Sequence, residues 1–514
     1  MFVVFRTDAN PRIGTGHLMR CLALADALAE RGAHCLFLCR GAGLGRTAAR
    51  IAAAGHDLYP VPEAAAAAAD EIAHSAWLPH GQSRDAELCR GILQRQPPVD
   101  WLVVDHYALA APWQTALRPA AGRILVIDDL ADRRHDCDLL VDQNFHPAAP
   151  QRYAGLLPAA AGTLTGPRHA LLRPEFARLR QAALARRLAA GAGPAARLLV
   201  LFGGADAADL TGRTVDLLAR QAFAGPVDVV VGPLYPGAQA LGRRLAALPG
   251  GTLHVNPGNV AELMAAADLA IGSPGGTSWE RCALGLPTVA IAAAANQEAM
   301  ARTLAEAGAH AYLGRHESLA DADFAAAVAF LASNAGARRH MAEVAGGLAD
   351  GRGAERIARR LLAPAVAVRP ASGDDAARLF SWRNDPRVRR RSFDPAPLVW
   401  DDHRAWIERT LADPARVLLV GTAAGEPAGC VRFDLTGEAA RVSLYLDPER
   451  LGQGLAVPLL DAAAAWLAAA RPEVRTLVAE VRSGNAASTA AFLGAGYAAD
   501  HAVYLKHLGA PESP

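Results

Sequence analysis

Short apolar runs alternate with helix-like segments along the first 150 residues of the chain. Between the first two apolar runs, Leu18, Cys21 and Leu28 recur at the spacing that places side chains on one face of a helix. Strands that alternate with helices are typical of a parallel, doubly wound sheet. The strands predicted here are residues 2–5, 35–39, 57–59, 101–104, 123–127 and 139–141.

A second alternating series follows a charged helical segment and a Gly/Ala/Pro hinge within residues 171–193. After a basic helix at 354–362, the pattern changes to antiparallel strands around a long helix at 457–470. We therefore predict an α/β protein with two Rossmann-like domains, 1–155 and 156–363, facing a cleft, and an α+β domain at 366–510. The further predicted strands are residues 197–202, 227–231, 252–255, 269–271, 287–291, 416–421, 429–434, 442–446 and 477–481.

The composition narrows the class of protein. The chain has 514 residues, enough for roughly three domains, and its net charge of +1 argues against a nucleic acid or an anionic membrane as partner. Its seven cysteines are scattered without metal-ligand spacing, which favours a reducing, cytoplasmic setting and predicts no metal. No apolar stretch reaches membrane-spanning length, so we expect a soluble cytoplasmic protein.

The turn Gly14-Thr15-Gly16-His17 joins the first predicted strand to the first helix. Glycines there bring backbone N–H groups close to an anion, and His17 would face whatever binds. The alternative is a tight turn whose histidine only fills a crevice. Polar residues at 105–107, 128–129 and 142–144 follow other strands, so they converge with His17 at the carboxyl edge of the sheet and favour an active site.

In the third domain, a strand leads through Gly452-Gln453-Gly454-Leu455-Ala456 into a helix, an arrangement that presents backbone N–H groups to a pyrophosphate. With Asn485, Ser488 and Gly496-Tyr497 downstream, residues 366–507 resemble the Gcn5-related N-acetyltransferase (GNAT) family, which uses acetyl-CoA. Trp382-Arg383-Asn384 and His403-x-x-Trp406 look like the branch that acetylates ribosomal proteins and amino sugars. The cofactor contacts implied by the resemblance are Leu444, Leu446, Gly452, Gly454, Leu455, Ala456 and Asn485.

Two positions depart from the GNAT pattern. Leu451 stands where Gln or Arg usually opens the glycine turn, with Arg450 one place early, but phosphate binding through main-chain N–H groups survives that change. Phe492 replaces the tyrosine often proposed to protonate the leaving thiolate, so water or another side chain must serve. A weakly active or inactive acetyltransferase is the alternative.

The first 360 residues carry a more specific series of motifs, in order and across both halves. These motifs are Arg6-x-Asp8-Ala9-Asn10-x-x-Ile13-Gly14-x-Gly16-His17-x-Met19-Arg20-Cys21, Asp105-His106-Tyr107, Asp128-Asp129, Asp142-Gln143-Asn144, Gly203-Gly204-x-Asp206, Gly275-Gly276-Thr277-Ser278-Trp279-Glu280 and Asn296-Gln297. They resemble the UDP-sugar hydrolase family of pseudaminic acid biosynthesis. The resemblance implies a GT-B-like fold and release of UDP, with inversion, from UDP-2,4-diacetamido-2,4,6-trideoxy-β-L-altropyranose. Ser273-Pro274 departs from the small residues usual there, and we expect only local loop adjustment.

Water attack at an anomeric carbon needs a proton acceptor, and imidazole titrates near working pH, so His17 is the predicted base. Asp8 and Asn10 are predicted to position sugar or water; for Asn10 the alternative is a loop side chain that satisfies local backbone groups. Helix N-termini after Gly204 and Gly275 would stabilise the leaving UDP, while Glu280 would bind the ribose and Asn296 the sugar. The predicted substrate contacts are Gly14, Gly16, Arg20, Asp105, Tyr107, Gly203, Gly204, Gly275, Gly276, Thr277, Ser278, Glu280, Asn296 and Gln297.

The pairing of the two modules implies an order of reactions. In that pathway an acetyltransferase acetylates the 4-amino group of the UDP-linked sugar before a hydrolase removes UDP, so a chain with both modules would catalyse consecutive steps. One alternative is a glycosyltransferase, because it shares the fold. The others are an enzyme of another nonulosonate route, such as that to legionaminic acid, and a nucleotide-sugar-binding module with a degenerate acetyltransferase.

Overall fold

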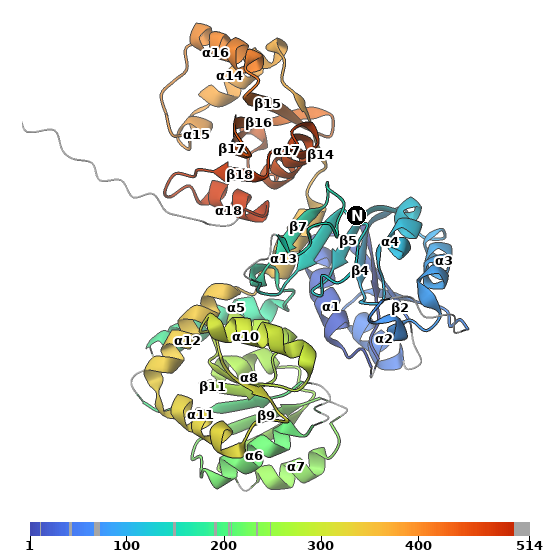
Figure 1. Cartoon of the computed structure of the whole chain (residues 1–514), viewed down its shortest axis with the longest axis vertical. Helices are drawn as coiled ribbons and strands as arrows, with labels where there is room; N and C mark the ends of the chain where they lie inside the picture. The colour runs from blue at the N-terminus through green and yellow to red at the C-terminus, as the bar shows by residue number, and fades with distance from the viewer. Residues whose placement is uncertain are drawn as a thin grey trace, which may run out of the picture. The chain divides into compact units, whose positions relative to one another are not determined.

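The chain divides into two compact units, residues 1–362 and 363–514, in a computed structural model (Figure 1). The first unit contains two parallel sheets and the second contains one mostly antiparallel sheet. The predicted residue Gly204 and the end of the predicted third domain, 498–510, lie outside the described residues. The structure describes residues 1–10, 12–40, 44–65, 72–146, 151–189, 193–203, 206, 208–232, 235–246 and 248–497.

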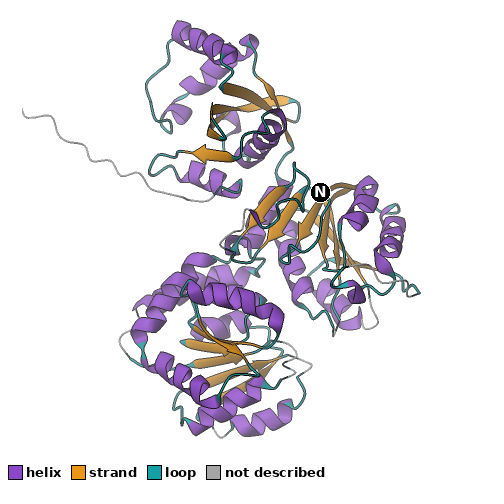
Figure 2. Ribbon diagram, in the orientation of Figure 1, coloured by secondary structure: helices purple, strands orange, loops and turns teal. Residues whose placement is uncertain are grey.

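The first sheet is parallel throughout, in the order β3-β2-β1-β4-β5-β6-β7. Helices cover both of its faces (Figure 2), which explains why its strands are continuous apolar runs: Val3 and Phe5 pack on one side and Val4 on the other. The strands are β1 (Phe2–Thr7), β2 (His34–Cys39), β3 (Asp57–Pro60), β4 (Val99–Asp105), β5 (Ala121–Ile127), β6 (Leu139–Asp142) and β7 (Gly162–Thr165). The helices between them are α1 (Gly16–Ala29), α2 (Leu44–Ala53), α3 (Gly81–Leu93) and α4 (Ala111–Leu117).

The second sheet is also parallel, in the order β10-β9-β8-β11-β12-β13. Its strands are β8 (Leu198–Leu201), β9 (Val227–Val231), β10 (Gly251–Val255), β11 (Leu269–Gly272), β12 (Thr288–Ala292) and β13 (Ala311–Arg315). Its helices are α5 (Pro174–Ala189), α6 (Leu210–Arg220), α7 (Ala238–Leu245), α8 (Val260–Ala266), α9 (Gly276–Ala283), α10 (Glu298–Glu306), α11 (Asp321–Ser333) and α12 (Ala335–Leu348). The predicted pair of Rossmann-like domains is therefore confirmed.

The last helix of the first unit, α13 (Gly353–Leu362), returns to the first sheet. Ile357 and Leu361 are fully buried in the core beside α1, and Trp101 Nε1 of β4 donates a hydrogen bond to Leu361 O at 3.0 Å. The sequence pattern places residues 354–362 in the second domain, whereas their apolar face packs in the core of the first.

The second unit has a five-stranded sheet in the order β14-β15-β16-β17-β18, antiparallel except for the parallel pair β17 and β18. Its strands are β14 (Val366–Pro370), β15 (Arg416–Ala423), β16 (Glu426–Thr436), β17 (Ala439–Leu446) and β18 (Thr476–Ala479). Leu459 and Leu467 of α17 pack on one face, and Leu379 and Ile407 of α14 and α16 on the other. Its helices are α14 (Ala376–Asn384), α15 (Pro386–Arg389), α16 (Trp400–Ala412), α17 (Ala456–Ala470) and α18 (Ala486–Gly494).

Candidate active site

The loop after β1 is held closed by Asn10. The Asn10 side-chain oxygen accepts hydrogen bonds from two backbone N–H groups further along the loop, each at 2.9 Å, and Gly14 N–H donates to Asn10 O at 2.7 Å. Gly14 lies at φ +80°, a conformation that favours glycine. The loop ends where α1 begins at Gly16, so His17 lies in the first turn of that helix. Asn10 thus satisfies local backbone groups, and its contact with sugar or water stays a prediction.

His17 is anchored by Asp105, the last residue of β4. His17 Nδ1 lies 2.6 Å from Asp105 Oδ1, and the Arg20 guanidinium donates to both Asp105 oxygens, each at 2.6 Å. Burial alone would raise the pKa of Asp105, but Arg20 and His17 outweigh it and hold this pKa well below its ordinary value. An ionised Asp105 accepts a hydrogen bond from His17 Nδ1–H, which leaves His17 Nε2 able to accept a proton. Asp105 is 0% exposed and contacts His17 and Arg20, and its predicted substrate contact stays a prediction.

Tyr107 and Asp129 complete the network around His17. Tyr107 OH donates to one oxygen of Asp129, and Arg20 Nη1 donates to the other at 3.1 Å. The Tyr107 ring packs edge-on against the imidazole of His17, with 4.6 Å between ring centroids. Burial and the neighbouring Asp129 charge raise the pKa of Tyr107 well above its ordinary value, so its phenol stays protonated. The predicted convergence at the carboxyl edge of the sheet thus occurs for His17, Asp105, Tyr107 and Asp129, and Arg20 of α1 joins them.

Two aromatic residues that the sequence analysis missed, His74 and Trp77, lie beside this network. The Trp77 ring stacks on Tyr107 with 5.2 Å between centroids and meets His17 edge-on at 5.6 Å, while His74 lies 4.9 Å from Trp77. Arg12 Nη1 donates to Ala76 O at 3.0 Å, which ties this aromatic turn to the loop after β1. The only signal in the sequence is a tryptophan in a stretch without helical or strand periodicity.

Asp8 belongs to a separate buried ion cluster. Its carboxylate accepts hydrogen bonds from Arg6 at 2.6 and 3.1 Å and from the backbone N–H of Arg40 at 2.7 Å, and it lies 3.2 Å from His106 Nε2. Arg6 also donates to Asp85 of α3 at 2.7 and 3.1 Å. Asp8 is 2% exposed, so these contacts join the end of β1 to its neighbours. Its predicted contact with sugar or water stays a prediction.

In the second sheet, the loop after β11 opens α9 at Gly276. Ser278 Oγ accepts from Gly275 N–H at 3.2 Å and from Arg281 at 3.1 Å, so this hydroxyl, in a residue only 2% exposed, closes the helix end. Its predicted substrate contact stays a prediction. Gly276 is exposed and Thr277 half-buried. The first N–H groups of a helix lack intrahelical partners and carry its positive dipole end, so this end of α9 is suited to an anion.

Glu280 lies on the same helix, and its side chain is 19% exposed. Burial of the rest raises the pKa of Glu280 to about 7, although Arg173 Nη2 at 4.0 Å opposes the shift. A carboxyl group that titrates near neutrality either accepts a hydrogen bond from a sugar hydroxyl or donates one to it.

The other predicted residues of this domain follow strands next to β11. Gly203 comes after β8 with φ +94°, and Asn296 is exposed in the turn after β12. Gln297 Oε1 accepts from Ala293 N–H at 2.9 Å and so holds that turn. Because β8, β11 and β12 are parallel neighbours, these residues and the start of α9 share one edge of the sheet.

In the second unit, the pairing of β17 with β18 ends at Val442 and Ala479. Leu444 and Leu446 follow this last pair, as expected for the strand edge along which the pantetheine is predicted to lie. Gly452 and Gly454 have φ +82° and +73° in the turn before α17, and the helix begins at Ala456. Leu455 is fully buried against the β15–β16 turn, and its predicted cofactor contact stays a prediction.

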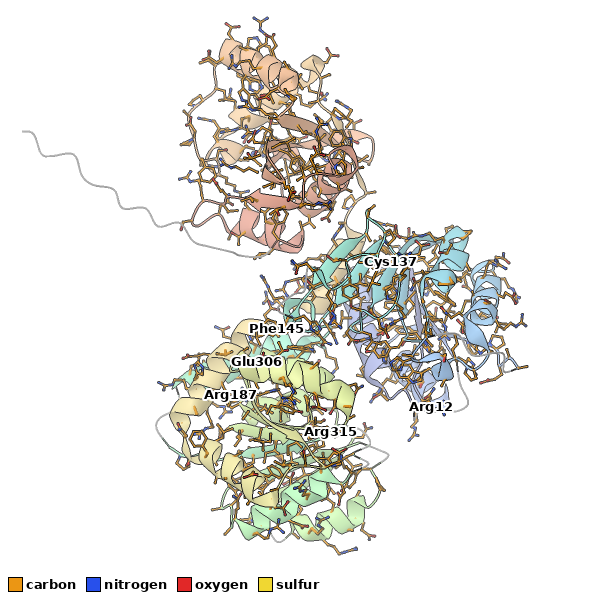
Figure 3. All side chains as sticks on the ribbon, viewed as in Figure 1. Arg12, Cys137, Phe145, Arg187, Glu306 and Arg315 are labelled. Atoms are coloured by element: carbon orange, nitrogen blue, oxygen red, sulfur yellow. The ribbon has the colours of Figure 1, made fainter. Side chains whose placement is uncertain are left out.

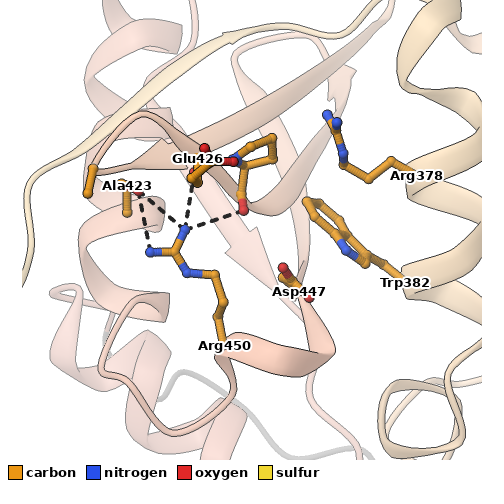
Figure 4. A pocket seen from close by; sticks show the side chains of 8 residues that line it. Arg378, Trp382, Ala423, Glu426, Asp447 and Arg450 are labelled. Atoms are coloured by element: carbon orange, nitrogen blue, oxygen red, sulfur yellow. Dashed lines mark hydrogen bonds between the residues drawn. The ribbon is translucent and has the colours of Figure 1, made fainter.

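The two departures from the GNAT pattern have structural roles. The Arg450 guanidinium donates to carbonyl oxygens of the β15–β16 turn at 3.1 to 3.4 Å and lines a cavity of about 390 Å³ (Figure 4). Phe492 is 7% exposed and packs against Tyr497, with 5.0 Å between ring centroids. Asn485 Oδ1 accepts from Ser488 N–H at 3.2 Å and caps α18.

Among the residues that the structure describes, no group of three or more His, Cys, Asp or Glu side chains is arranged to hold a metal ion. Within the same stretches of chain, no helix combines the length and apolar character needed to cross a bilayer.

The architecture of the first unit is of the GT-B type. The crystal structure of Acinetobacter baumannii MurG matches 70% of this chain and 99% of its own, with a TM-score of 0.51 and 16% sequence identity. At that identity the likeness shows the fold alone. Two Rossmann-like domains of the GT-B type are thus followed by an acetyltransferase (GNAT) domain, whose family model matches residues 366–498.

Two curated relatives match parts of the chain. Over 177 residues the chain is 27% identical to the UDP-2,4-diacetamido-2,4,6-trideoxy-β-L-altropyranose hydrolase of Campylobacter jejuni. The matched stretch covers 34% of this chain and 53% of the hydrolase. The chain is 31% identical over 129 residues to the uncharacterized protein MJ1062 of Methanocaldococcus jannaschii, covering 24% of this chain and 26% of that protein. The chain therefore spans about half the length of the first relative and about a quarter of the second.

Proposed function

We propose that the first unit hydrolyses a UDP-linked sugar by water attack at its anomeric carbon. The observation that carries this proposal is the fixed imidazole of His17, whose Nδ1 is held by buried Asp105 and whose Nε2 is left as a base. The partial similarity to the Campylobacter jejuni hydrolase supports a UDP-2,4-diacetamido-2,4,6-trideoxy sugar as the substrate. The products are then UDP and 2,4-diacetamido-2,4,6-trideoxy-altrose, a step of pseudaminic acid biosynthesis.

In the proposed step, His17 Nε2 removes a proton from water as the water oxygen bonds to the anomeric carbon. The bond from that carbon to the UDP oxygen breaks on the opposite face, its electron pair leaves with UDP, and the configuration is inverted. Asp105 stays ionised and stabilises the imidazolium that forms, because Arg20 holds its charge. Backbone N–H groups at the start of α9 stabilise the diphosphate charge as it develops.

We propose further that the second unit acts first on the same substrate and acetylates its 4-amino group. The amine attacks the thioester carbonyl of acetyl-CoA, coenzyme A leaves as its thiolate, and the nitrogen loses a proton. The match to the GNAT family model supports acetyl-CoA as the cosubstrate. The positive φ angles of Gly452 and Gly454 support a pyrophosphate site built from backbone N–H groups.

UDP release in the absence of any acceptor tests the hydrolase assignment. We expect the acetylated UDP-sugar to yield UDP in water alone, and we expect His17→Ala to lose this activity while still binding UDP. His34→Ala is the matched control, because it removes an exposed histidine of the same domain. Strict dependence on a sugar or lipid acceptor would instead establish a glycosyltransferase, and UDP-sugar binding without hydrolysis in the parent would establish a binding module.

A further inference from the structure

One side chain, Asn144, bridges the two sheets of the first unit. Asn144 follows β6, and its Nδ2 donates to Asp129 Oδ2 at 3.3 Å while its Oδ1 accepts from Trp279 Nε1 at 3.1 Å. Trp279 lies in the first turn of α9 and is 1% exposed. The helix end suited to an anion is therefore hydrogen-bonded, through Asn144, to the domain that contains His17.

The bridge continues to the imidazole. Arg20 donates to the same Asp129 oxygen that accepts from Asn144, and its guanidinium also holds Asp105, which holds His17 Nδ1. Five consecutive side-chain hydrogen bonds, none longer than 3.3 Å, thus join Trp279 to His17. Every acceptor after Asn144 is a carboxylate, so these bonds are of the stronger, charge-assisted kind.

We infer that Asn144 is a positioning residue that couples occupancy of the α9 N-terminus by a diphosphate to the orientation of His17. The inference rests on the proposed function, which assigns the diphosphate to α9 and the base to His17. Residues 128–129 and 142–144, two of the motifs that follow strand ends, take no direct part in the proposed hydrolysis. The coupling gives these motifs a role.

The contacts around Asn144 hold its segment to both sheets, so a movement of α9 is passed on through Asn144. Next to it, Phe145 packs against the core of the second sheet (Figure 3), and the Gln143 side chain accepts from Leu171 N–H at 3.1 Å. The backbone N–H of Asn144 donates to Asp142 Oδ1 at 2.9 Å, which holds the other side of the segment to β6. A displacement of α9 on binding an anion therefore moves the Asn144 amide against Asp129.

Trp279→Phe tests the coupling, because it deletes the Nε1 donor and leaves a ring in the core. Asn144→Ala is the second variant, since it breaks the same bridge at a half-buried position. Trp101→Phe is the matched control: it also removes one buried indole hydrogen bond from the first unit, at 3.0 Å, but lies outside the bridge. The probe is UDP, with its affinity measured by calorimetry and the His17 ring observed through its ¹⁵N NMR resonances.

In the parent and in Trp101→Phe, we expect UDP to shift the His17 ¹⁵N resonances. In Trp279→Phe and Asn144→Ala, we expect UDP to bind within about threefold of the parent affinity without that shift, and kcat to fall about tenfold with KM little changed. An undiminished shift and kcat in both variants would overturn the coupling and leave the proposed hydrolysis intact. A parent that binds UDP and shows the shift without hydrolysing the sugar would overturn the proposed function but support the coupling, and a parent that fails to bind UDP would overturn both.

Discussion

Replacement of Asp105 by Asn tests whether the carboxylate beneath His17 sets its protonation. Asn has the same shape, but its NH2 group replaces either Oδ1, which faces His17 and Arg20 Nη2, or Oδ2, which faces Arg20 Nε. If it faces His17, it donates to Nδ1, and the imidazole proton moves to Nε2, which then cannot act as a base. In either place it also opposes an Arg20 donor, at a site that is 0% exposed.

The first orientation removes the base, and both remove the negative charge that stabilises the imidazolium, so we expect Asp105→Asn to lower kcat about 10²- to 10⁴-fold, the usual contribution of a general base. That range corresponds to about 3 to 5 kcal/mol in the activation free energy. Arg20 keeps its bond to Asp129 but loses one of its acceptors on residue 105, so the free energy of unfolding is also expected to fall, by about 1 to 3 kcal/mol. The folded fraction is therefore measured by circular dichroism before UDP release is assayed at saturating substrate.

Asp100→Asn is the matched control for this experiment. Asp100 lies on the same strand, is exposed, and accepts from Phe2 N–H at 2.7 Å, a bond that the amide oxygen of Asn preserves. We expect its kcat to equal that of the parent. A kcat for Asp105→Asn above about a third of the parent value, in protein shown to be folded, would refute the role assigned to the carboxylate.

Three other substitutions test separate parts of the account. Gly454→Ala should weaken acetyl-CoA binding about fivefold in calorimetry, because a Cβ at φ +73° costs about 1 kcal/mol, whereas Gly437→Ala at φ +59° in a hairpin should not. Because burial raises the pKa of Asp142 to about 7, the folded state loses stability as pH rises from 4 to 7; Asp142→Asn should therefore gain about 4 kcal/mol over the parent between pH 4 and pH 8 in urea unfolding. Phe492→Ala should destabilise the second unit by about 3 to 5 kcal/mol in scanning calorimetry and leave UDP release from the acetylated sugar unchanged.

For each of these three substitutions, a different result would contradict the prediction. Equal loss of acetyl-CoA affinity in both glycine variants would mean that the turn before α17 is not the pyrophosphate site. An unchanged stability difference between Asp142→Asn and the parent across that pH range would mean that Asp142 is ionised throughout. Loss of UDP release in Phe492→Ala would show that the two units depend on each other for folding.

The alternation of apolar runs was sufficient to predict most strands, because buried parallel strands are apolar on both faces. Three strands escaped prediction: β7 offers one large apolar residue, β13 is only half-buried and contains Gly314, and the edge strand β14 ends in Pro370. The sequence pattern also could not predict that α13 packs on the first sheet. An amphipathic face shows that a helix packs but not on which of two sheets.

The meeting of His17, Asp105, Tyr107 and Asp129 could be predicted because carboxyl ends of parallel strands share an edge. The separate roles of these residues could not be predicted. Burial of Asp105 beneath His17 depends on Arg20. The long-range contacts of Asp8 come from Arg40, after β2, and from His106, after β4, which no local pattern connects to it. Trp77 reaches His17 only through tertiary placement of an irregular turn.

The central claim is that one chain acetylates and then hydrolyses the same UDP-sugar. Its most direct test is incubation of the full chain with a UDP-4-amino-4,6-dideoxy sugar in ¹⁸O water, with and without acetyl-CoA, followed by mass and NMR analysis. We expect free diacetamido sugar and unlabelled UDP only when acetyl-CoA is present. Release of UDP from the unacetylated sugar at the same rate, or of UDP that carries ¹⁸O, would contradict this claim.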